Sequence, residues 1–68
     1  MNQDAEIMKY LRTGPHTAIV KILRRYNKPL SIDFLAHLMG RSRREVREYV
    51  DGLKKSGIVE IEEMVVLK

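Results

Sequence analysis

The chain has 68 residues and a mass of 8.0 kDa, so it forms one small domain with little room for both a hydrophobic core and a deep substrate pocket. It contains no cysteine, which excludes disulfides, iron–sulfur clusters and thiolate-bound zinc. Thirteen Lys and Arg against nine Asp and Glu give a net charge of +4, which suits a polyanionic partner such as nucleic acid or an anionic membrane surface.

The pattern predicts an N-terminal helix within residues 1–13, from about Asp4 to Thr13. Ile7, Met8 and Leu11 fall on one face of this helix. Gly14 can end it, because glycine readily takes the left-handed conformation that terminates helices. The apolar face makes this helix a candidate dimerisation element, and packing of the helix on the core of its own chain is the alternative.

A helical core is predicted over residues 15–56. Its first helix begins at Pro15, where the missing N–H is tolerated, and ends at Asn27. The residue before a proline is pushed out of the helical region of backbone conformation, so the helix cannot continue through Lys28-Pro29. The apolar residues of this helix recur with helical period at Ile19, Ile22, Leu23 and Tyr26.

Two further helices follow within residues 31–56. Ser31 is a good N-cap for the first of them, and Gly40 ends it. Ser42 and Glu45 form a capping box, so the next helix starts at once and runs to about Ser56. The inward positions of this last helix are Val46, Tyr49, Val50 and Leu53.

The residue pattern of the C-terminal segment, residues 58–67, predicts a β-hairpin. It is rich in β-branched residues in two short runs, one from Ile58 to Ile61 and one from Met64 to Leu67. The turn falls at Glu62-Glu63, which lacks the glycine that two-residue hairpin loops favour.

The most informative stretch is Leu35-Ala36-x3-Gly40-x5-Val46-x2-Tyr49-Val50. A small residue such as Ala36 lets two helices cross closely, and Gly40 permits the tight turn between them. With the preceding helix and the terminal hairpin, residues 15 to 67 resemble a winged helix-turn-helix domain of archaeal and bacterial transcription regulators. The expected fold class is mainly α with a small β hairpin: a three-helix core, an extra N-terminal helix and a C-terminal two-stranded wing, all in one domain of residues 1–68.

The resemblance implies a DNA-binding protein, a transcriptional regulator whose recognition helix, residues 42–56, enters the major groove of double-stranded DNA. Arg43, Arg44 and Arg47 face outward on its first two turns, where the helix dipole opposes positive charge. Arginine binds guanine and phosphate in bidentate fashion. The candidate DNA-binding residues are Arg41 (at a phosphate), Ser42, Arg43, Arg44, Arg47 and Glu48, with Lys21, Arg24 and Arg25 as further phosphate contacts.

Other readings stay open. Arg44/Glu48, Arg47/Asp51 and Asp51/Lys55 are spaced as i,i+4 pairs, so this face can also be an ordinary solvated one. The predicted wing tip carries glutamates, which repel phosphate, and this favours an alternative function as a winged-helix protein–protein interaction adaptor or assembly subunit. Structure-selective binding of RNA or single strands is a third possibility, which the predicted burial of the aromatic residues argues against.

No catalytic residues, cofactor or metal are predicted. The chain has no Ser/His/Asp set and no Gly-rich phosphate loop, and His16 and His37 are lone histidines without further ligands. No apolar run approaches the roughly 18 residues of a membrane span, and the N-terminus lacks the order of a signal peptide. We therefore expect a cytoplasmic, nucleoid-associated protein, with a composition typical of thermophiles.

We also expect a homodimer, formed through the N-terminal helix or the C-terminal hairpin. A domain this small has a marginal core. The apolar residues of these two segments form a larger exposed hydrophobic surface than a domain of this size is expected to have.

Overall fold

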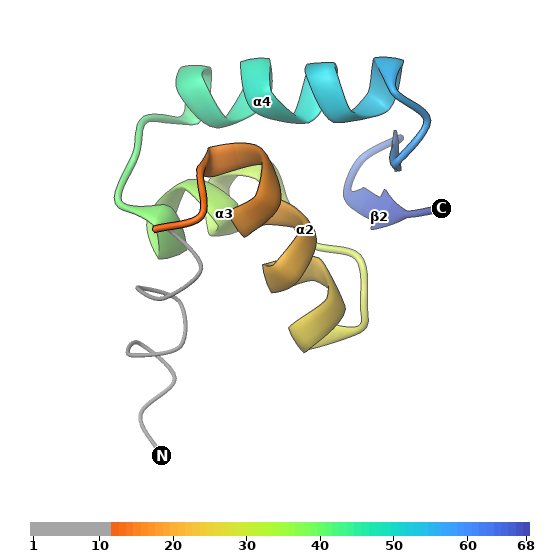
Figure 1. Ribbon diagram of the computed structural model, residues 1–68, viewed down its shortest axis with the longest axis horizontal. Helices are drawn as coiled ribbons and strands as arrows, with labels where there is room; N and C mark the ends of the chain where they lie inside the picture. Colours follow the sequence, from red (N-terminus) through yellow and green to blue (C-terminus); the bar gives the residue numbers. More distant parts are fainter. Residues whose placement is uncertain (1–11) are drawn as a thin grey trace.

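The computed structural model describes residues 12–68, which fold as three helices followed by a two-stranded hairpin (Figure 1). The predicted N-terminal helix falls outside this range, apart from Arg12 and Thr13, which form a turn. The elements in chain order are helices α2 (Pro15–Tyr26), α3 (Ile32–Met39) and α4 (Arg43–Lys55), and strands β1 (Val59–Ile61) and β2 (Val65–Leu67).

The helices begin and end at the residues that the sequence indicates. Asn27, with φ of 53°, ends α2 in the left-handed conformation. Ser31 caps α3 by accepting a hydrogen bond from the backbone N–H of Phe34 at 3.1 Å. Gly40, with φ of 65°, ends α3, and α4 begins at Arg43 after a short turn.

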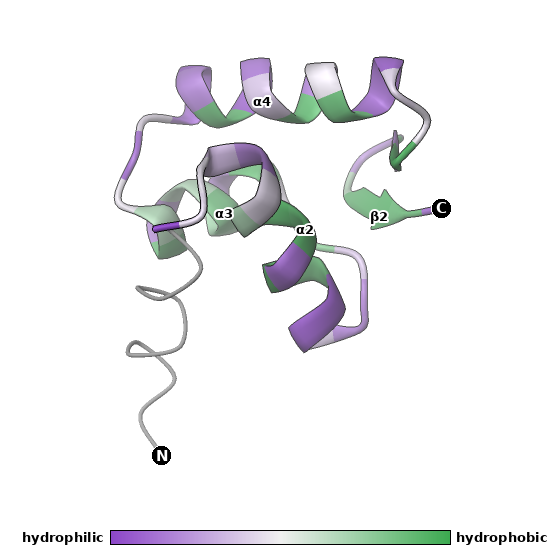
Figure 2. Ribbon diagram, viewed as in Figure 1, coloured by the Kyte–Doolittle hydropathy of each residue, from purple (hydrophilic) through white to green (hydrophobic). Residues whose placement is uncertain are grey.

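One hydrophobic cluster joins the inner faces of all five elements. Figure 2 shows the hydrophobic residues of α4 on the side that faces α2 and α3, with hydrophilic residues on its outer side. Ala36 is buried in this cluster together with Val46 and Val50, as the predicted crossing of α3 and α4 requires. Tyr49 is only half-buried, at the margin of the core.

The hairpin differs from the prediction at its turn. The strands pair antiparallel with Val59 opposite Leu67, Glu60 opposite Val66 and Ile61 opposite Val65. Leu30 also pairs with Val65 through two backbone hydrogen bonds of 3.0 and 2.8 Å. Because Ile61 pairs with Val65, the turn between the strands has three residues, Glu62, Glu63 and Met64. Ile58 also lies outside the strands.

Within the described residues, no helix has the length and apolar character needed to cross a membrane.

Candidate nucleic-acid interface

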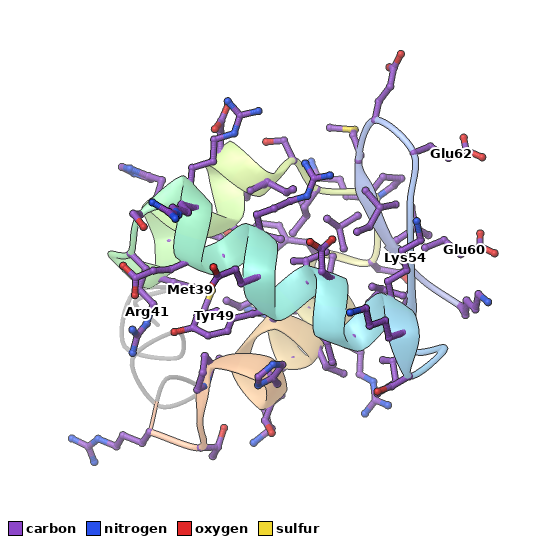
Figure 3. All side chains as sticks on the ribbon, turned by 90° about the horizontal axis from the view of Figure 1, so that it is seen from above. Met39, Arg41, Tyr49, Lys54, Glu60 and Glu62 are labelled. Carbon is purple, nitrogen blue, oxygen red and sulfur yellow. The ribbon has the colours of Figure 1, made fainter. Side chains whose placement is uncertain are left out.

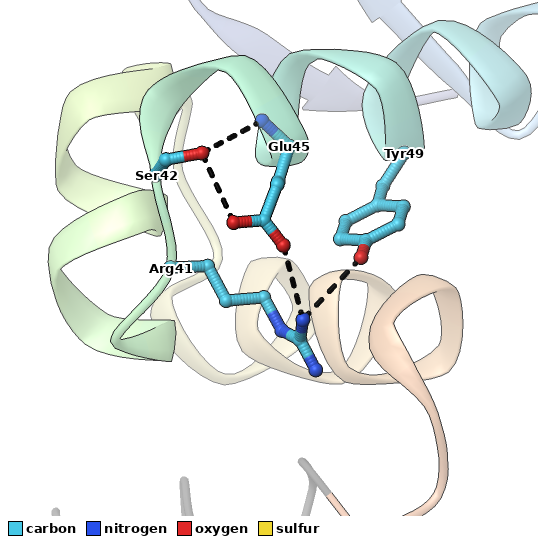
Figure 4. A network of polar contacts seen from close by, with 4 residues as sticks. All are labelled: Arg41, Ser42, Glu45 and Tyr49. Atoms are coloured by element: carbon cyan, nitrogen blue, oxygen red, sulfur yellow. Dashed lines mark hydrogen bonds and ion pairs between the residues drawn. The ribbon is translucent and has the colours of Figure 1, made fainter.

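The N-terminus of α4 is fixed by a capping interaction. The Ser42 hydroxyl accepts a hydrogen bond from the Glu45 backbone N–H at 3.2 Å and donates one to the Glu45 carboxylate at 3.1 Å (Figure 4). Hydrogen bonds from Ser42, followed by those from Arg41, hold the pKa of Glu45 below its ordinary value of 4.5. The predicted capping box thus sets where the helix starts and gives its first turn an ionised carboxylate.

Arg41 lies against the flank of α4. Its guanidinium donates to the Glu45 carboxylate at 3.2 Å and to the Tyr49 hydroxyl at 3.4 Å, and lies 5.8 Å from the centre of the Tyr49 ring (Figure 4). Tyr49 in turn packs edge-on against His16 of α2, with ring centres 5.2 Å apart. Arg41, which the sequence suggested for a phosphate contact, therefore has protein partners along the side of the helix.

The outer face of α4 carries Arg43, Arg44, Arg47 and Glu48, all of them exposed. Arg43 reaches across to Asp33 of α3 at 3.2 Å, and Arg47 pairs with Asp51 one turn later at 3.5 Å. In the part of the chain that the structure describes, Arg44 forms no ion pair.

Two of these contacts bear on the alternative of a solvated face. Of the three predicted i,i+4 pairs on α4, the described residues form only the one between Arg47 and Asp51. The pair between Arg43 and Asp33 was not predicted, because its two residues belong to different helices. The face is therefore not a continuous ladder of intrahelical pairs, and Arg44 has its guanidinium available for a ligand.

The basic residues of α2 are separate from this face. Arg24 and Arg25 lie in the last turn of α2, and Lys21 precedes them by about one turn. Figure 1 shows that this end of α2 lies away from α4, whereas its first turn contacts α4 through His16 and Tyr49. The candidate contacts on α2 and those on α4 thus form two groups.

The wing is acidic on its outer edge. Glu60, Glu62 and Glu63 are exposed, and in Figure 3 the labelled Glu60 and Glu62 lie at the far end of the molecule from Arg41. Lys68 approaches Glu60 at 4.0 Å. Within residues 12–68, no group of three or more His, Cys, Asp or Glu side chains is placed to hold a metal ion.

Three helices with a tight, glycine-ended turn between α3 and α4, followed by an antiparallel hairpin, define a winged helix-turn-helix domain. A family model described as "HTH domain" matches residues 16–63, and the chain belongs to this helix-turn-helix family. Membership supports a DNA-binding, regulatory role. Neither a curated protein nor a solved structure matched the chain.

Proposed function

We propose that the chain is a transcriptional regulator that lays α4 in the major groove of double-stranded DNA. The observation that carries the proposal is the division of α4 into two faces. Val46, Val50 and Leu53 are buried in the core, while Arg43, Arg44 and Arg47 are exposed on the opposite face of the first two turns. Positive charge near a helix N-terminus is unfavourable for the helix itself, so a ligand is the better reason for it.

In this proposal the three arginines contact base edges and phosphates, with Ser42 and Glu48 beside them. Arg41 contacts a phosphate only after leaving Glu45 and Tyr49. Lys21, Arg24 and Arg25 supply contacts to flanking phosphates. The protein acts at the nucleoid, as a homodimer whose two recognition helices meet half-sites one turn, or about 34 Å, apart.

Fluorescence anisotropy with labelled random duplex DNA across a salt series tests the DNA-binding step. We expect affinity to fall steeply with salt, because each neutralised phosphate contributes about −0.9 to the slope of log K against log salt. Changing Arg43, Arg44 and Arg47 together to Gln should abolish most binding. The matched control changes Lys54 and Lys55 at the other end of α4 to Gln, and should retain it.

The protein-interaction alternative predicts a different pattern. It expects the arginine variant to bind DNA no differently from the wild-type protein, and changes in the wing to damage a protein complex. In the proposed function, changing Glu62 and Glu63 to Gln leaves the affinity for a duplex that accommodates a single copy unchanged or raises it slightly, because it removes repulsion from phosphate. Absence of DNA binding at about 50 mM salt would refute the proposal, since non-specific binding is strongest at low salt.

A further inference from the structure

The outer side of the wing has an apolar centre. Leu30 and Val65 are paired and both are buried, so their neighbours Pro29 and Val66 lie on the opposite, outer side of the sheet. Val66 is 37% exposed and stands opposite Glu60 on β1. The outer side of the sheet therefore carries a row of three residues, the acidic Glu60 followed by the apolar Val66 and Pro29.

Most of the exposed large hydrophobic side chains of the described residues gather at this place. Met64 is 43% exposed and Phe34 36%, and both line a shallow hollow with Pro29. A second shallow hollow is lined by Pro29, Met64 and Val66 together with the wing glutamates. We name Pro29, Phe34, Met64 and Val66 the apolar wing face.

Opposite charges border the apolar wing face on its two sides. The wing glutamates Glu60, Glu62 and Glu63 line the hollow on the side of β1 and the turn. Lys28 lines the hollow on the side of the α2–α3 connection. Among the described residues, Lys28, Glu62 and Glu63 have no ion-pair partner, so their charges are available to a second molecule.

We propose that the apolar wing face is the surface through which two copies of this chain form a homodimer. In a two-fold interface the same patch meets itself, and the residues on one margin meet those on the other. Such an arrangement stacks the apolar centres and sets Lys28 of one copy against the wing glutamates of its partner. A face with both charge signs on opposite margins is complementary to itself, because the two-fold axis places Lys28 of each copy next to the wing glutamates of the other.

The inference also accounts for two features that DNA binding leaves unexplained. It gives the acidic wing, which phosphate repels, a function that does not involve DNA. It also covers apolar surface that a domain of this size can hardly leave in water. It rests on the homodimer of the proposed function and selects the hairpin, rather than the N-terminal helix, as the element that forms it.

Sedimentation equilibrium of the full chain over a wide concentration range, without DNA, measures the dimer dissociation constant. We expect Val66→Lys to raise this constant about tenfold or more, because it places a charge in the centre of the interface. The new lysine stands opposite Glu60 in the monomer, so the hairpin should remain folded. The control is Ile58→Lys, at a residue that is 41% exposed but lies outside the face, and it should leave the constant unchanged.

A charge exchange gives a second, independent test. Lys28→Glu and Glu63→Lys should each weaken the dimer, and the double variant should regain most of the loss, with thermal unfolding confirming that each variant folds. A wild-type chain that stays monomeric, a Val66→Lys variant that dimerises as the wild type does, or a double variant that is no better than the singles would overturn the proposal. A dimer that meets these expectations but binds no duplex DNA would refute the proposed function alone.

Discussion

Replacing Asp33 by Asn should tighten DNA binding, although Asp33 lies on α3 and not on the proposed recognition helix. Its carboxylate holds the Arg43 guanidinium at 3.2 Å, and both side chains are highly exposed, at 72% for Arg43 and 71% for Asp33. Exposed pairs of this kind are worth about 0.2–1 kcal/mol. Arg43 must give up this energy before it can contact DNA, so removing the carboxylate should raise affinity by about 1.4- to 5-fold.

A double-mutant cycle isolates this effect. DNA affinity is measured by anisotropy at one fixed salt concentration for the wild type, Asp33→Asn, Arg43→Ala and the double variant. The gain from Asp33→Asn should disappear when Arg43 is Ala, because no guanidinium is then held back. Arg44→Ala is the matched comparison: Arg44 has no carboxylate partner among the described residues, so the gain from Asp33→Asn should persist in that background.

Two results would refute this reasoning. If Asp33→Asn raises affinity equally in the Arg43→Ala background, Asp33 acts by repelling phosphate and not by holding Arg43. If Asp33→Asn leaves wild-type affinity unchanged while Arg43→Ala lowers it, the ion pair does not compete with DNA. Thermal unfolding of each variant accompanies the binding data, because Asp33 also lies in the first turn of α3, where its charge favours the helix.

Three further predictions concern the fold that carries the interface. Ala36→Leu should overpack the α3–α4 crossing and destabilise the domain by about 1–3 kcal/mol in urea unfolding. The control His37→Leu, at the next residue, which is exposed, should be nearly neutral, and equal effects of the two variants would place the crossing elsewhere. Gly40→Ala should cost about 1–2 kcal/mol through the backbone alone, because φ is 65° and nothing lies within 4 Å of an added Cβ. The pKa of Glu45 in the folded protein lies below 4.5, so the contribution of Glu45 to stability is present above pH 4.5 and is lost as the pH falls below that value. Glu45→Gln should therefore reduce the loss of stability in acid, measured by urea unfolding at several pH values, and an unchanged pH profile would contradict this prediction.

The sequence was sufficient for the features that depend on neighbouring residues. The caps at Ser31, Gly40 and Ser42 act within one turn of the chain, so their residue types alone predict where α3 begins and ends and where α4 begins. The inward side of α4 follows from its helical period in the same way. These local signals account for the agreement between the predicted and observed helices.

Contacts between distant residues could not be predicted in this way. Leu30 pairs with Val65 only after the helices have packed, and nothing near Leu30 in the sequence distinguishes it from a simple connection. The same holds for the ion pair between Asp33 and Arg43, which requires the crossing of α3 and α4. Arg41 lies before the N-cap of α4, so the helical spacing does not predict its contact with Tyr49, eight residues later.

The outer face of α4 combines a fixed backbone with adaptable side chains. Buried Val46, Val50 and Leu53, together with the Ser42 cap, fix the position of the helix, since core residues cannot move without opening cavities. On the outside, Arg43 and Arg47 are held only by exposed ion pairs, which are weak and exchange readily for other partners, and Arg44 has no ion pair among the described residues. A helix built in this way presents a constant shape to a groove while its charged groups adjust to the atoms they meet there. For this reason we expect substitutions in the core to change the stability of the domain, and substitutions among the arginines and their aspartate partners to change the affinity for DNA.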